Sequence, residues 1–189
     1  MTRPDTVASD ERLRLFLALR LPEAVLDVLE AWQRTHLEGL GLAGFSAVPR
    51  EHLHVTLAFL GHRPAGELEA IVAALREAVA AAGPDLQLAP VGYRETRSVA
   101  MVVLEDRTGA ATALAEDLHA RLEALGAYRR EDRPWLPHVT VARFRTRPGL
   151  RLEPPPMGTF VPSDAAAYLS RLHPKGARYA VLESVALGG

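Results

Sequence analysis

Apolar residues recur with two different periods along this chain. Apolar and polar residues alternate from Arg12 to Arg20, which predicts a strand with one apolar face. Three longer stretches carry apolar residues every three or four positions and are each followed by glycine, which predicts helices. We expect these helices over residues 22–38, 64–82 and 109–125.

Short apolar runs bounded by glycine or proline predict six further strands. They are expected at Leu53–Leu60, Leu86–Tyr93, Ser98–Leu104, Pro137–Phe144, Ala165–Leu172 and Arg178–Leu187. The triplet Pro174-Lys175-Gly176 predicts the turn between the last two. Short strands, few helices and mostly tight turns favour an α+β fold with antiparallel sheets.

The pattern His-apolar-Thr-apolar occurs twice, once in each half of the chain, beginning at His54 and at His138. Both copies lie within predicted strands. Because side chains alternate between the faces of a strand, His54 shares a face with Thr56, and His138 with Thr140. If the two strands face each other, one cleft receives two imidazoles and two hydroxyls. Two imidazoles can supply a base and an acid near neutral pH.

Composition narrows the functional classes. The chain has 189 residues, a net charge of −1 and no cysteine, which excludes a thiolate nucleophile, a disulfide framework and a cysteine-type zinc site. Its basic residues are 21 Arg and one Lys, without a global basic field. No apolar run reaches the roughly 18 residues that span a membrane. We expect a cytoplasmic protein with a disordered tail over residues 1–10, followed over residues 11–189 by one globular unit or two closely packed lobes.

Five segments carry a family resemblance. They are LHVTLAFLG at 53–61, PHVTVAR at 137–143, RLFLA at 14–18, LSRL at 169–172 and GARY at 176–179. With these segments, the chain resembles the two-histidine phosphoesterase superfamily. Within it, the chain is similar to the RNA 2′,3′-cyclic phosphodiesterases, historically called 2′-5′ RNA ligases. The resemblance runs from about residue 12 to residue 187.

The resemblance implies a bilobal, pseudo-twofold α+β fold, with two antiparallel sheets flanked by helices and the active cleft between the lobes. It implies no metal and no cofactor. The substrates would be RNA ends or nucleotides that carry a 2′,3′-cyclic phosphate, hydrolysed to a 2′-phosphate, with 2′-5′ ligation as the reverse reaction. A monomer is the default expectation.

The resemblance also implies site residues. His54 and His138 would be catalytic, and Thr56, Thr140 and Arg143 would bind the phosphate. We assign His54 as the acid and His138 as the base, although the sequence does not determine which is which. Arg143 stands an odd number of positions after His138, so an ideal pleat would point it away from the cleft. It must therefore lie at a strand end or a bulge.

Two alternatives remain open at this stage. His52 and His54 share a face, which suits two zinc ligands and predicts a zinc-dependent hydrolase. The cleft could also bind RNA ends without turnover. An arginine-rich stretch could form a basic rim or a solvated loop; its members are Arg129, Arg130, Arg133, Arg145, Arg147 and Arg151. We assign no role to His36, His62, His119 and His173, which we interpret as residues of helix surfaces or turns.

Overall fold

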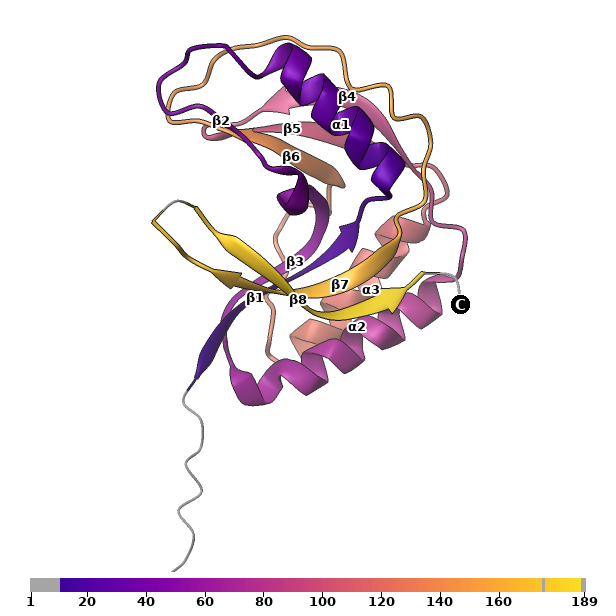
Figure 1. Ribbon diagram of the computed structural model, residues 1–189. Helices are drawn as coiled ribbons and strands as arrows, with labels where there is room; N and C mark the ends of the chain where they lie inside the picture. Colours follow the sequence, from indigo (N-terminus) through magenta and orange to yellow (C-terminus); the bar gives the residue numbers. More distant parts are fainter. Residues whose placement is uncertain (1–10, 175, 188–189) are drawn as a thin grey trace, which may run out of the picture.

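The computed structural model describes residues 11–174 and 176–187, which form three α-helices and eight strands (Figure 1). The strands are β1 (Arg12–Arg20), β2 (Ser46–Ala47), β3 (His54–Pro64), β4 (Leu88–Glu95), β5 (Val99–Asp106), β6 (His138–Arg143), β7 (Asp164–Arg171) and β8 (Arg178–Ala186). The helices are α1 (Glu23–His36), α2 (Leu68–Ala82) and α3 (Ala110–Ala124), with 3-10 turns η1 (Arg50–His52) and η2 (Ala65–Glu67). All three predicted helices and seven predicted strands are present, while β2 and η1 were not predicted.

The strands form two lobes that meet at a single residue pair. Their order is β4-β5-β6-β3-β1-β7-β8, with β2 paired to β6, and every pairing is antiparallel. Between β6 and β3 the only paired residues are Val55 and Val139. The predicted antiparallel α+β fold is therefore confirmed. Its two expected sheets are joined at this pair into one sheet.

The helices cover the outer faces of the lobes and leave the faces toward each other open (Figure 1). Helix α1 lies over β4, β5 and β6, while α2 and α3 lie over the lobe formed by β3, β1, β7 and β8. Each helix buries one apolar stripe, as the spacing predicts. Among the described residues, no helix combines the length and apolar character needed to cross a bilayer.

Strand β3 continues beyond its predicted end at Leu60. Gly61 adopts φ of +67°, and the pairing with β1 shifts so that Phe16 faces Phe59 while Leu15 faces Gly61. Leu60 is therefore the extra residue of a bulge, and glycine tolerates the left-handed conformation beside it. Gly61 thus bends the strand without ending it. The predicted tail, residues 1–10, and Lys175 of the predicted turn lie outside the described residues.

Candidate active site

The junction between the lobes brings the two repeated motifs together. Val55 pairs with Val139 in antiparallel register, and each is the second residue of its motif. The strands run antiparallel through this pair, so His54 lies on the side of Thr140, and Thr56 on the side of His138. Each end of the pair therefore carries the histidine of one motif and the threonine of the other.

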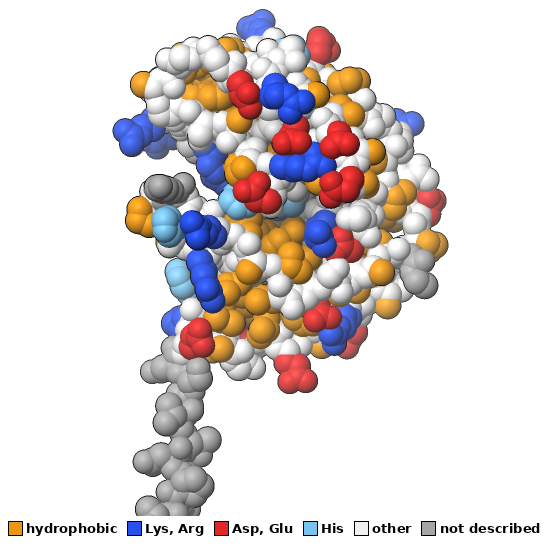
Figure 2. All heavy atoms as spheres, in the orientation of Figure 1, with side chains coloured by type: hydrophobic (Ala, Val, Ile, Leu, Met, Phe, Trp, Pro, Cys, Tyr) orange, Lys and Arg blue, Asp and Glu red, His pale blue; other side chains and the backbone are white. Residues whose placement is uncertain are grey.

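A cleft of about 540 Å³ opens beside this junction and takes its lining from both lobes. Figure 2 shows the hollow on the left, between the upper lobe and the β7–β8 hairpin, with basic and histidine side chains around it. No described residue that lines it is acidic, so its field favours an anion. The polar and charged lining residues are Arg14, Ser46, His52, His54, Thr56, Thr140, Arg143, Ser170 and Tyr179.

The second motif histidine lies beside the junction of the lobes and does not line this cavity. His138 is half-buried and is not among the lining residues, although its charge lowers the pKa of His54. Its Nδ1 donates a hydrogen bond of 2.8 Å to the carbonyl of Leu136. A carbonyl can only accept, so this contact leaves Nε2 of the neutral ring without a proton. That nitrogen is then available as a base.

The His54 ring has the same backbone contact and a more enclosed environment. The carbonyl of His52, again two residues earlier, bonds the ring, which also stacks on Phe16 with centroids 5.0 Å apart. The pKa of His54 is lowered to about 4, mainly by burial; the bond to the His52 carbonyl opposes this shift, and the positive charges of His52, His138 and Arg143 add to it. His54 is therefore neutral at pH 7 in the unliganded cleft.

A bulge at the same offset in each motif strand changes which residues face the cleft. In β3, Ala18 pairs with Thr56 and Leu17 with Ala58, so Leu57 is the extra residue. The extra residue resets the alternation of faces. Phe59, five positions after His54, consequently lines the cleft.

In β6, Met101 pairs with Thr140 and Ala100 with Ala142, so Val141 is the extra residue. Arg143, five positions after His138, then lines the cleft from the last position of β6. The sequence required Arg143 to lie at a strand end or a bulge in order to reach the cleft, and it lies both at the end of β6 and after a bulge. Phe59 is its counterpart in the other lobe, and we did not predict that it lies in the cleft.

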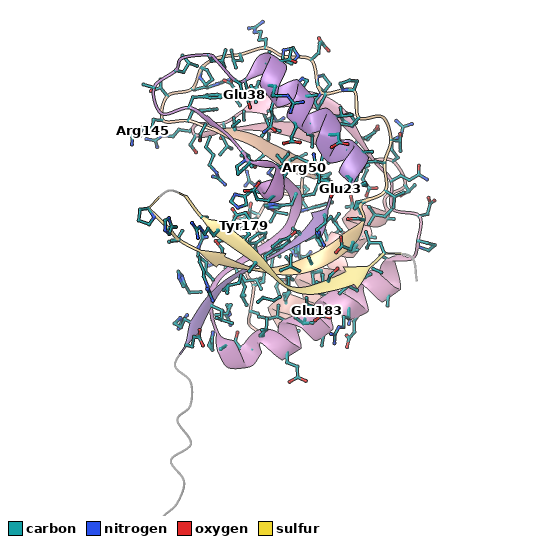
Figure 3. The ribbon with its side chains drawn as sticks, viewed as in Figure 1. Glu23, Glu38, Arg50, Arg145, Tyr179 and Glu183 are labelled. Carbon is teal, nitrogen blue, oxygen red and sulfur yellow. The ribbon has the colours of Figure 1, made fainter. Side chains whose placement is uncertain are left out.

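The turn η1 that leads into the first motif is fixed to helix α1 by Arg50. Its guanidinium contacts the carboxylates of Glu23, Asp27 and Glu30 at 2.5, 2.9 and 2.6 Å. Figure 3 labels Arg50 and Glu23 near each other at the lower end of α1. Because the carbonyl that contacts His54 belongs to His52 in this turn, the anchor supports the orientation of the ring.

His52 lies in the cleft beside His54, as the zinc interpretation requires. Its ring centroid is 4.2 Å from that of Tyr179, a β8 residue at the cleft (Figure 3). Burial lowers the pKa of His52. Within residues 11–174 and 176–187, no group of three His, Cys, Asp or Glu side chains is arranged to hold a metal.

Two expectations about other residues change. None of the six arginines of the arginine-rich stretch lines the cleft, and three of them pair with acids, namely Arg130 with Glu123, Arg133 with Glu131 and Arg147 with Glu95.

The interpretation of His119 as a surface residue was wrong, because this residue is only 6% exposed and packs under β3. His119 continues the stripe of Ala111, Ala115 and Leu118, a spacing that could have revealed it.

Comparisons with known proteins agree with this architecture. A curated protein of Thermus thermophilus named RNA 2′,3′-cyclic phosphodiesterase is 35% identical over 94% of this chain and 91% of its own length. One of Escherichia coli with the same name is 28% identical over 94% and 98%. The apo crystal structure of Escherichia coli LigT covers 95% of this chain and 99% of its own, with 25% identity and a TM-score of 0.77.

The family profile extends across both motifs. The 2′-5′ RNA ligase superfamily matches residues 21–173, which include β3, β6 and most of the residues that line the cleft. The chain belongs to the 2′-5′ RNA ligase superfamily.

Proposed function

We propose that this protein hydrolyses 2′,3′-cyclic phosphates at RNA ends or on nucleotides and leaves a 2′-phosphate. The observation that carries the proposal is one cationic cleft, without acidic lining among its described residues, beside which both His-x-Thr pairs converge. Two curated relatives that are named RNA 2′,3′-cyclic phosphodiesterase support the same substrate class. The cleft volume of about 540 Å³ suits a nucleotide-sized group.

The reaction needs a base and an acid on opposite sides of phosphorus. Water attacks phosphorus while the bond from phosphorus to O3′ breaks, so one group takes a proton from water and another gives one to O3′. His138, with Nε2 free of a proton in its neutral form, suits the base, and His54 is then the acid. The hydroxyls of Thr56 and Thr140 and the guanidinium of Arg143 face the charge that builds on the non-bridging oxygens.

The low pKa of His54 sets a condition on this assignment. A general acid must carry its proton when the substrate is bound, yet burial keeps His54 neutral in the free cleft. A bound phosphate brings negative charge beside the ring, which favours the charged imidazolium and raises the pKa. Binding of the anion therefore promotes the uptake of a proton from solvent by His54, and the negative charge of the phosphate offsets the positive charges nearby.

We expect nuclear magnetic resonance titration to reveal this change directly. In the free protein His54 should titrate near pH 4, because burial disfavours its charged form. Saturating 2′-AMP should move that midpoint upward by at least about one pH unit, since an adjacent opposite charge shifts a pKa by one to three units. His54→Gln provides the resonance assignment. A midpoint that stays near 4 with ligand bound would make His54 the base and His138 the acid.

Run in reverse, the same geometry would join a cyclic phosphate end to a 5′-hydroxyl. The hydroxyl then replaces water as the nucleophile, and the chemical steps are otherwise those of hydrolysis. Water is the more abundant nucleophile, so we propose hydrolysis as the main reaction.

Incubation with an RNA ending in a 2′,3′-cyclic phosphate, in the presence of EDTA, tests the proposed function. We expect undiminished turnover to a 2′-phosphate end, because two imidazoles can perform the proton transfers. The control is the same reaction without chelator. Activity that disappears in EDTA and returns with zinc would favour a metal site at His52 and His54, and tight binding without turnover would favour a binder of RNA ends.

A further inference from the structure

The bulged residue of each motif strand has its carbonyl bonded by a buried polar side chain from a helix. Nε2 of Gln33, on α1, donates to the carbonyl of Val141 at 2.8 Å and to that of Val48 at 2.9 Å. Nε2 of His119, on α3, donates to the carbonyl of Leu57 at 2.8 Å. Gln33 and His119 are 3% and 6% exposed. The same arrangement therefore occurs once in each lobe.

These contacts lie where β3 and β6 separate. The two strands pair only at Val55 and Val139, so the carbonyls just beyond this pair have no partner on the opposite motif strand. A buried carbonyl without a donor is costly, and proteins almost always supply one. Val141 also accepts a hydrogen bond of 2.9 Å from the backbone nitrogen of Val48. Gln33 thus links the segment around β2 to β6 at the bulge.

The link bears on the position of Arg143. Ser46 pairs with Arg143 and Ala47 with Ala142, so the β2 segment lies directly beside the end of β6. The bulge at Val141 is what brings Arg143 onto the face that holds the cleft. A side chain that bonds both Val48 and Val141 fixes the bulge and its neighbouring strand together.

We propose that Gln33 is a positioning residue that holds Arg143 in the cleft through the Val141 bulge. The inference rests on the proposed function, because it assigns Arg143 to the bound phosphate. Gln33 does not line the cleft and reaches it only through the backbone carbonyls of Val141, in β6, and of Val48, a lining residue. His119 makes the equivalent contact with the bulge at Leu57, so the same arrangement supports the motif strand of each lobe.

A double-mutant cycle between Gln33 and Arg143 tests this inference. Gln33→Met keeps the length of the side chain and removes its donors. We expect it to weaken binding of 2′-AMP and to lower kcat/KM about tenfold, since small misplacement of a binding group is costly. In an Arg143→Ala background, the same substitution should have no further effect on either quantity. Leu29→Ala, a packing change on the same helix, should lower Tm without changing the affinity for 2′-AMP.

The outcomes separate the inference from the proposed function. An equal loss of affinity in both backgrounds, or a lower Tm with normal affinity, would assign Gln33 a purely structural role. If Gln33→Met does not fold, Gln33→Asn, which is too short to bridge both carbonyls, replaces it in the cycle. The binding measurement needs no turnover. Absent hydrolysis by the unmodified protein would therefore overturn the proposed function, while the cycle would still decide the role of Gln33.

Discussion

Replacing either motif histidine with alanine should slow hydrolysis of a 2′,3′-cyclic phosphate by at least about a hundredfold, the usual effect of removing a general acid or base. The reason is geometric, since each ring lies one residue from the pair that joins the lobes and has a fixed carbonyl contact. Single-turnover rates for His54→Ala and His138→Ala measure the effect. The double variant should be far less than multiplicatively worse, because groups that act as a unit are not additive.

His52→Ala is the matched control for these variants. It removes an imidazole from the same cleft, two residues from His54, without removing either proton carrier. We expect a mild loss of rate by comparison. Near-normal turnover in His54→Ala or His138→Ala, or an equally large loss in His52→Ala, would refute the two-histidine mechanism.

Arg143→Ala should lower kcat/KM by about a hundredfold, the scale on which a donor to developing charge contributes. Arg143 is one of two arginines among the described residues lining the cleft, and it lies at the end of the strand that carries His138. Arg143→Lys should recover only part of the loss, because an ammonium cannot contact two phosphate oxygens in the fixed geometry of a guanidinium. Initial rates across substrate concentrations give both parameters.

Arg145→Ala controls for the loss of one positive charge near the cleft. Arg145 is exposed at the tip of the upper lobe and does not line the cavity (Figure 3). It should change kcat/KM only slightly at moderate salt. Equal losses of kcat/KM in Arg143→Ala and Arg145→Ala would mean that Arg143 acts by long-range attraction of the phosphate and not by contact with it.

The sequence predicted most of what depends on local period and little of what depends on strand register. The alternation from Arg12 to Arg20 and the repeated motifs correctly located β1, β3 and β6. The bulges at Leu57 and Val141 were not foreseeable from the alternation, because an extra residue is defined only against the partner strand.

The bulges explain why Phe59 was missed and why Arg143 could be placed only conditionally. An uninterrupted period of two would point both residues away from the cleft. Strand β2 has only two residues, too few to show an alternation of apolar and polar positions. It forms by pairing with the end of β6, which has no partner on β3 beyond the junction. His119 is different, since the helical stripe that buries it is visible in the sequence.

If the two lobes rock, the single strand pair between Val55 and Val139 is the natural fulcrum of that motion. When bodies rock about a fulcrum, points next to it travel least and distant points travel most. His54 and His138 each lie one residue from it, so rocking would change their separation little. Leu172, 72% exposed at the far end of the β7–β8 hairpin, lies on a long lever arm and would move most. We therefore expect that the cleft can widen at its outer end without separating the two rings.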